Sequence, residues 1–111
     1  MNSFVFDSER KGSCYHEFYK GQWDNKTFWK EDSISLHDDI LFECPDFVDS
    51  ILDIIPNYDY FGETEISYVQ WKQIGEVVKT KNVMAQEIYS EADSWLIKVF
   101  EKYPCFTILG I

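Results

Sequence analysis

Few side chains in this sequence could act as catalysts. Two histidines are present, His16 and His37, and histidine is the residue whose ordinary pKa suits general base catalysis near neutral pH. His37 precedes Asp38 and Asp39, which could orient its ring, and Cys14 lies two residues before His16, a spacing that a strand places on one face. The sequence indicates no oxyanion donor for either pair, and an acid-rich chain often puts a carboxylate beside a histidine. We therefore predict no catalytic residue and no enzymatic activity.

Motifs for phosphates, metals and cofactors are also missing. The five glycines are isolated, so there is no glycine-rich phosphate loop, and no G-x-S-x-G occurs. Zinc sites need close pairs of ligands, and Cys14 with His16 is one pair without a second. The calcium-binding ladder of an EF-hand is absent, so we interpret Asp38 and Asp39 as a solvated turn. The sequence predicts neither a metal nor a cofactor.

The unusual feature of the sequence is the position of its charge. The net charge is −10 at pH 7, and residues 31–66 contain eleven acidic residues but no lysine or arginine. The flanking segments, 1–30 and 67–111, are nearly neutral. Apolar residues are interleaved with the acids, so the segment can fold with its carboxylates outward. Such a surface can serve solubility alone, but it repels nucleic acid and anionic lipid and attracts a basic protein.

We predict that one helix and one loop of this segment form a binding surface. Pro45 and an apolar face over residues 47–55 predict the helix, whose acids at spacings i, i+3 and i+7 share the opposite face. The loop, residues 57–66, is rich in tyrosine, a residue frequent at recognition surfaces, although its aromatic side chains could equally cap the core. The predicted partner-binding residues are Asp46, Asp49, Asp53, Tyr58, Asp59, Tyr60, Glu63 and Glu65.

The remaining patterns predict the elements that hold this surface. Apolar runs and alternation predict strands over residues 3–6, 14–19, 27–29, 33–37 and 105–109. Besides the acidic helix, a capping box of Ser67 with Gln70 starts a helix that ends near Lys79, and Asn82 caps another that reaches Tyr103. This order predicts an α+β fold, with one mostly antiparallel sheet and about three helices packed on one face.

Length and composition predict a single domain, residues 1–111, with its own core. The first ten residues do not resemble a signal peptide, and no apolar window is long enough to span a membrane, so we expect a cytoplasmic protein without membrane contact. Three widely spaced cysteines agree with a reducing compartment. Cys44 and Cys105 have apolar neighbours, which predicts buried, reduced thiols.

The segment from Asp46 to Trp71 resembles a known group of proteins. An acidic helix runs into the motif Tyr58-Asp59-Tyr60-Phe61-Gly62-Glu63-Thr64-Glu65-Ile66, a helix opens with Gln70-Trp71, and the chain ends in Phe106-Thr107-Ile108-Leu109-Gly110-Ile111. These features resemble immunity proteins of bacterial contact-dependent growth inhibition and other polymorphic toxin systems. The resemblance covers about the last two thirds of the chain and does not extend to its first third.

The resemblance implies a small cytoplasmic protein that binds the C-terminal domain of one cognate toxin and blocks it. Such toxins are often nucleases with a basic, phosphate-binding cleft, which fits the acidic segment. Two other functions stay open. A nucleic-acid mimic that inhibits another DNA- or RNA-binding protein would need an extended acidic stripe rather than a compact patch. A small enzyme would need a deep pocket that places His16, His37 or a cysteine beside a carboxylate.

Overall fold

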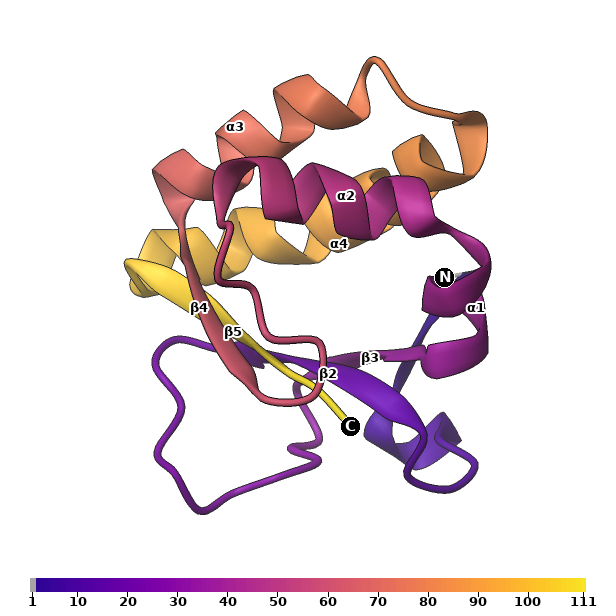
Figure 1. Ribbon diagram of the computed structural model, residues 1–111. Helices are drawn as coiled ribbons and strands as arrows, with labels where there is room; N and C mark the ends of the chain where they lie inside the picture. The colour runs from indigo at the N-terminus through magenta and orange to yellow at the C-terminus, as the bar shows by residue number, and fades with distance from the viewer. Residues whose placement is uncertain (1) are drawn as a thin grey trace.

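A layer of helices covers one face of a five-stranded sheet in the computed structural model, which describes residues 2–111 (Figure 1). The strands are β1 (Phe4–Phe6), β2 (Tyr15–Lys20), β3 (Ile34–His37), β4 (Glu63–Ser67) and β5 (Cys105–Leu109). The helices are α1 (Asp38–Glu43), α2 (Pro45–Ile54), α3 (Tyr68–Val78) and α4 (Val83–Lys102), and a 3₁₀ turn, η1, covers Asp7–Glu9. The predicted α+β fold is confirmed.

All neighbouring strands of the sheet are antiparallel, in the order β1-β3-β2-β5-β4. The last strand, β5, therefore lies between β2 and β4, with Phe18 opposite Ile108 on one side and Ile66 opposite Phe106 on the other. All five residues of β5 are buried, because helices cover one face of the strand and a loop approaches the other. This position explains why the sequence of β5 is a continuous apolar run.

The helix layer buries its aromatic side chains against the sheet. Trp71 on α3 is fully buried, its indole Nε1 donates to Asp93 on α4 at 2.9 Å, and its ring stacks on Tyr89 with centroids 4.2 Å apart. Gly75 makes this approach possible, because a Cβ at that position would lie 2.4 Å from the Tyr89 hydroxyl. Below Trp71, Phe106 of β5 continues the aromatic core at a centroid distance of 5.4 Å.

Local capping chemistry sets the helix starts. The predicted capping box is confirmed: the Ser67 hydroxyl accepts from the backbone N–H of Gln70, whose side chain accepts from the backbone N–H of Ser67. Asn82 caps α4 with its side chain, which accepts from the backbone N–H of Ala85. The structure has four α-helices where the sequence predicted about three, and the additional helix is α1. His37 caps that helix, because its Nδ1 accepts the Asp39 backbone N–H at 3.0 Å.

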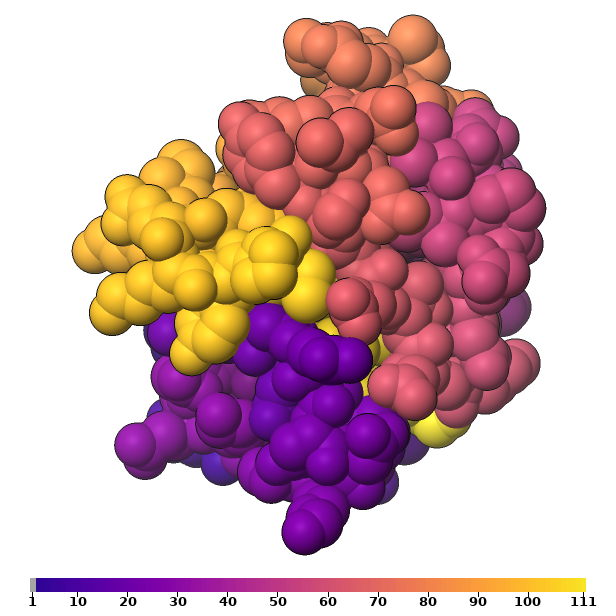
Figure 2. Space-filling view, turned by 90° about the vertical axis from the view of Figure 1, so that its left-hand side faces the viewer, coloured from indigo at the N-terminus to yellow at the C-terminus, as the bar shows by residue number. Residues whose placement is uncertain are grey.

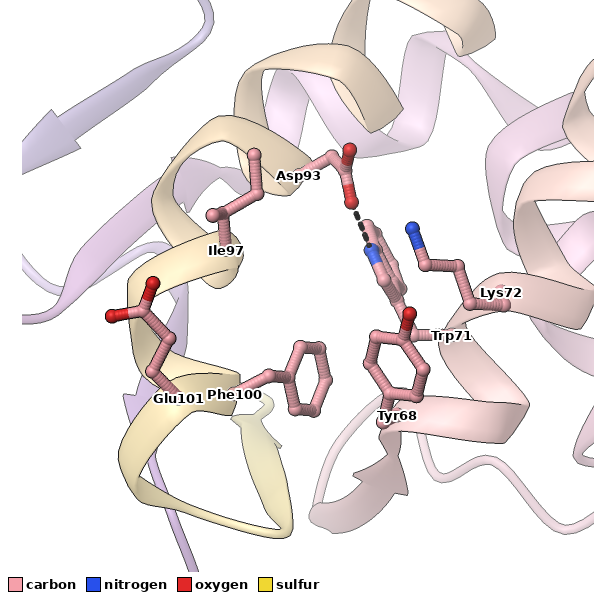
Figure 3. Close-up of a pocket in the computed structure, with 7 residues that line it drawn as sticks. All are labelled: Tyr68, Trp71, Lys72, Asp93, Ile97, Phe100 and Glu101. Atoms are coloured by element: carbon pink, nitrogen blue, oxygen red, sulfur yellow. Dashed lines mark hydrogen bonds between the residues drawn. The ribbon is translucent and has the colours of Figure 1, made fainter.

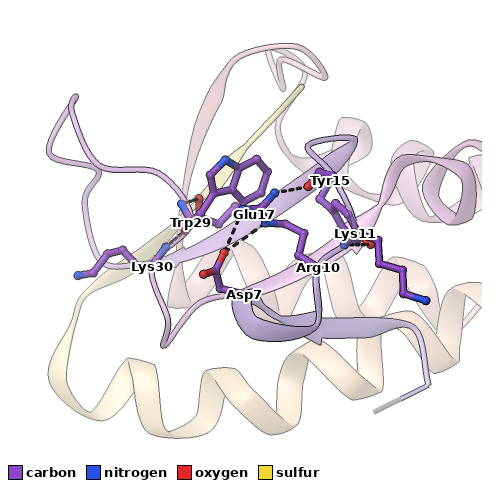
Figure 4. Close-up of polar contacts among 8 residues, drawn as sticks. Asp7, Arg10, Lys11, Tyr15, Glu17, Trp29 and Lys30 are labelled. Atoms are coloured by element: carbon purple, nitrogen blue, oxygen red, sulfur yellow. Dashed lines mark hydrogen bonds and ion pairs between the residues drawn. The ribbon is translucent and has the colours of Figure 1, made fainter.

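The expectation that Asp38 and Asp39 form a solvated turn is therefore wrong, since both belong to the first turn of α1. The predicted strand over residues 27–29 is also wrong, because these residues belong to the loop of residues 21–33. A buried carboxylate holds the end of that loop: Glu17 on β2 accepts the backbone N–H groups of Trp29, at 2.8 Å, and Lys30, at 3.1 Å (Figure 4). Trp29 has φ +60° there, which no strand residue adopts.

The acidic loop predicted over residues 57–66 is wrong in its second half, where β4 forms the edge of the sheet. Two glutamates at alternating positions, Glu63 and Glu65, obscured the strand in the sequence because acidic residues are depleted in strands. They occupy exposed positions, whereas Thr64 and Ile66, which alternate with them, are buried. Carboxylates on an edge strand also discourage pairing with other chains.

The position of β5 between β2 and β4 leads to a stability prediction. Truncation after Pro104 removes the strand that joins β2 to β4, so we expect a chain without cooperative unfolding in urea and with a collapsed amide NMR spectrum. Removal of Ile111 alone deletes an exposed side chain outside the strand and serves as the control. A native-like spectrum from the longer truncation would contradict this account of the sheet.

Candidate functional site

The predicted binding residues occupy two regions of the surface. Asp49 and Asp53 are exposed on α2, which lies on the outside of the helix layer. Asp46 at the start of α2 is half-buried, and its carboxylate accepts the Asn82 backbone N–H at 3.3 Å. In Figure 2, the magenta atoms of α2 and the rose atoms of residues 55–65 form a continuous strip along the right-hand side. The acidic helix and the segment that follows it therefore share one side of the molecule.

The two glutamates of β4 point away from the other acids. Because Thr64 and Ile66 face the helices, Glu63 and Glu65 project from the opposite face of the sheet. Asp59 is exposed in the turn that connects the two regions. The structure thus brings the acids of α2 together and keeps the β4 pair apart from them, as a second acidic region.

The tyrosines of this segment do not supply the predicted contact area. Tyr58 has 8% of its surface exposed and belongs to the core, so its prediction as a partner-binding residue is wrong. Tyr60 is half-buried, and its hydroxyl donates to Asp38. The exposed aromatic residue of the turn is Phe61, which is 71% exposed. Sequence alone could not separate these three neighbours, because a turn lacks the regular periodicity that distinguishes inner from outer positions.

Within residues 2–111, most carboxylates of the segment 31–66 have no lysine or arginine partner. Among the described residues, one ion pair joins them to a lysine or arginine, that of Asp32 with Lys20 at 3.5 Å. Two further contacts involve histidines: Asp38 with His16, and Asp39 with His37. The lysines of the flanking segments therefore leave the acids of α2, Asp59 and β4 without charge pairs within residues 2–111. Within each of the two acidic regions, the fields of these carboxylates add up.

Asp38 has a structural role between three elements. The His16 Nε2 on β2 lies 2.8 Å from the Asp38 carboxylate, which also accepts the Tyr60 hydroxyl. These hydrogen bonds, from Tyr60 first and then from His16, lower the pKa of Asp38. Burial lowers the pKa of His16 more than Asp38 raises it. The imidazole is fully buried, and its Nδ1 has no partner among residues 2–111, so protonation would leave an unpaired N–H in the interior.

The residues considered for catalysis are not arranged as an active site. His16 is inaccessible to a substrate, and the Nδ1 of His37 is used by the cap of α1. Cys14 is exposed, whereas Cys44 and Cys105 are buried and free of disulfides, as predicted. Burial, and secondarily the neighbouring carboxylate of Glu65, raise the pKa of the Cys105 thiol to about 11. At neutral pH this thiol carries its proton and is a poor nucleophile.

A surface hollow between α3 and α4 was not foreseen. Its volume is about 410 Å³, and its lining residues are Tyr68, Trp71, Lys72, Asp93, Ile97, Phe100 and Glu101 (Figure 3). One signal existed in the sequence, because residues 68, 71 and 72 share one helix face. The Trp71 indole N–H and the Asp93 carboxylate are already hydrogen-bonded to each other in the hollow. Its lining includes no histidine, cysteine or serine. The hollow combines apolar and aromatic surface with the charged side chains of Lys72, Asp93 and Glu101.

A second hollow, of about 360 Å³, lies where the loop of residues 21–33 meets the ends of β4 and β5. Its lining residues are Trp23, Phe28, Phe61, Gly62, Glu63, Leu109, Gly110 and Ile111. Its walls come from three separate stretches of chain, so no local sequence pattern indicates it. It joins exposed aromatic side chains to one of the predicted binding residues, Glu63.

Comparisons of the chain with protein-family models, with curated proteins and with solved structures found no match. Within residues 2–111, no group of three or more histidine, cysteine, aspartate or glutamate side chains is placed to hold a metal ion. None of the helices in the same part of the chain is both long enough and apolar enough to cross a membrane.

The contact between His16 and Asp38 leads to a prediction on pH. Both pKa values are lowered by folding, so the unfolded chain binds protons more readily, and stability is lost as the pH falls. For His16 the loss begins near its ordinary pKa of 6.5 and continues toward its folded value. We expect the urea midpoint of the protein to fall between about pH 7.5 and about pH 5.5. In His16→Gln, which keeps a donor for Asp38, that fall should shrink; an equal fall in both proteins would contradict the assignment.

Asp53 gives a second prediction, because it lies in the last turn of α2, where the helix dipole disfavours a carboxylate. Asp53→Asn should raise the free energy of unfolding by about 0.3–1 kcal/mol, measured by urea denaturation. Asp49→Asn, which removes the same charge from the middle of the helix, is the control and should have a smaller effect. Equal changes in the two variants would point to general charge repulsion instead of the dipole.

Proposed function

We propose that this protein binds and neutralises the toxin domain of a bacterial polymorphic toxin system, in the cytoplasm of the cell that makes it. The observation that supports the proposal is the acidic segment 31–66. It folds with its apolar residues in the core and leaves most of its carboxylates exposed and without lysine or arginine partners among the described residues. The complementary partner is a protein with a basic cleft, as in a nuclease.

Inhibition would need no chemistry from this protein. The summed negative field attracts a basic domain and speeds the encounter at low salt. After the encounter, hydrogen bonds from lysine and arginine to the carboxylates of α2 and β4 fix the orientation. A carboxylate surface that fills a phosphate-binding cleft excludes the substrate by volume and by charge.

The position of the acids favours this reading over a mimic of a long nucleic acid. A mimic needs carboxylates in a row at phosphate-like spacing, whereas here the α2 acids and the β4 acids lie on different faces of the molecule. The protein is about 34 Å long and carries two separate acidic regions. This arrangement fits the two walls of a basic cleft better than a continuous groove that binds a nucleic-acid duplex.

The first experiment uses the open reading frame directly upstream of the gene in its native host. If that frame encodes a large secreted protein, we expect its C-terminal domain to arrest growth when expressed alone. Co-expression of this protein should restore growth, and the two chains should co-elute in size-exclusion chromatography. A neighbouring toxin domain that is neither bound nor neutralised would contradict the proposal.

Charge variants then locate the interface. Asp49→Asn with Asp53→Asn, or Glu63→Gln with Glu65→Gln, should weaken binding of that toxin domain at least about tenfold, a loss of about 1.4 kcal/mol, because each charged hydrogen bond contributes about 1.5–3 kcal/mol. The matched control is Glu87→Gln with Glu101→Gln, which removes two exposed charges from α4. Titration calorimetry at low and high salt provides the measurement. Equal losses in all three double variants would indicate attraction by net charge alone.

A further inference from the structure

The hollow at the start of β4 and the end of β5 is lined by several exposed apolar side chains. Figure 2 shows the purple atoms of the loop of residues 21–33 facing the rose atoms that follow α2, with the yellow end of the chain between them. Around this hollow, Phe61 is 71%, Phe28 51% and Ile111 44% exposed. Single exposed apolar residues are ordinary, but here three of them line one hollow together with Trp23, which makes the hollow a candidate contact site.

The first wall of the hollow is held in place before anything binds. The Asp24 carboxylate accepts the backbone N–H groups of Lys26 and Thr27 and the Thr27 hydroxyl, and these bonds hold the pKa of Asp24 at about 2. The Trp23 indole Nε1 donates to the Thr27 carbonyl at 2.8 Å, and its ring lies 5.1 Å from that of Phe28. Both aromatic side chains therefore stay in position without a partner.

The second wall is equally fixed. The Asp59 carboxylate accepts the Phe61 backbone N–H at 3.0 Å, which closes the turn that presents Phe61. The backbone N–H of Gly110 donates to the Gly62 carbonyl at 2.6 Å, and a Cβ at Gly110 would lie 2.2 Å from the Tyr60 carbonyl oxygen. Glycine at position 110 thus lets the end of the chain close against this turn. Walls that are already ordered lower the entropic cost of binding.

The charges around the hollow identify its occupant. Glu63 lines the hollow, Glu65 follows on the same face of β4, and neither carboxylate has a lysine or arginine partner among the described residues. A second copy of this chain would bring its own carboxylates and a net charge of −10, so it would be repelled. An apolar or aromatic side chain next to a lysine or arginine fits both the walls and the charge.

We infer that this hollow is a docking site for a basic segment of a partner protein, in which an apolar side chain enters between Phe61 and Phe28 and a flanking lysine or arginine binds Glu63. The inference deepens the proposed function and rests on it for the identity of the partner. It also gives the two acidic regions different roles in binding. The β4 region holds an apolar side chain together with a basic one, whereas the acids of α2 contribute charged hydrogen bonds without an apolar anchor.

The site can be tested with a probe that does not depend on the toxin. The probe is the peptide acetyl-Lys-Phe-Lys-amide, added to isotope-labelled protein and followed by two-dimensional amide NMR. We expect saturable shifts of the Trp23 indole N–H and of the backbone N–H groups of Gly62, Glu63 and Ile111. Acetyl-Lys-Ser-Lys-amide and acetyl-Glu-Phe-Glu-amide each lack one of the two features and should bind at least about fivefold more weakly. Shifts centred elsewhere, or equal binding of all three peptides, would overturn the inference.

A pair of matched variants separates the site from general attraction. Phe61→Ala with Glu63→Gln should reduce peptide binding at least about fivefold. Phe42→Ala with Glu43→Gln removes an exposed phenylalanine and a neighbouring carboxylate from α1 and should leave binding unchanged. All four side chains are exposed, so both variants should keep the native amide spectrum. Equal losses in the two variants would also overturn the inference.

The toxin complex distinguishes this inference from the proposed function. If the upstream toxin domain binds and Phe61→Ala with Glu63→Gln weakens the complex at least about tenfold, both are supported. If that variant binds the toxin unchanged, the docking site is wrong and the proposed function stands. If the peptide maps to the hollow but no toxin is neutralised, the site stands and the proposed function fails.

Discussion

The fold depends on how residues 31–66 combine eleven acids with a large share of the core. Two exposed charges about 10 Å apart in water repel by about 0.4 kcal/mol before screening by salt. Burial of one leucine, isoleucine or phenylalanine side chain contributes about 1.5–3 kcal/mol. The buried side chains of this segment include Ile34, Leu36, Leu41, Phe47, Ile51, Ile55, Tyr58 and Ile66. Their burial outweighs the repulsion, so a strongly acidic surface is compatible with an ordered domain.

The carboxylates of this protein perform two different tasks, which composition alone does not distinguish. Asp24, Asp59 and the buried Glu17 each accept backbone N–H groups and fix a turn or a loop end. Asp38 receives hydrogen bonds from two other elements of the fold. Carboxylates such as Asp49 remain exposed on regular elements and are free to meet a partner. The acidic residues therefore build the turns as well as the outer surface.

The elements that sequence predicted correctly are those with local signals. The starts of α3 and α4 are set by Ser67 and Asn82 within three residues of the helix, and β5 is apolar throughout because both its faces are covered. The candidate site was predicted in part, since the exposure of Asp49 and Asp53 follows from the helical spacing around an apolar face.

The failures come from interactions that are distant in sequence. The segment around Trp29 looks like a strand, but Glu17, twelve residues earlier, fixes it as a loop that approaches the outer face of the sheet. The β4 strand exists because Glu65 pairs with Thr107, more than forty residues later. Tyr58 is buried because helices and sheet close over it, and the hollow beside Phe61 needs three segments that are far apart in the chain. No local pattern carries this information.

The place of β5 in the sheet has a consequence for how the protein is made. Leu109 pairs with Glu17 and with Glu63, so the pairings of β5 join parts of the chain that are synthesised at widely separated times. A ribosome adds about 5–20 residues per second, and until the last strand has been added, β2 and β4 have no common neighbour. The nascent chain must therefore keep its aromatic core from aggregating for seconds, a period in which the mutual repulsion of its carboxylates acts as an intrinsic solubilising agent.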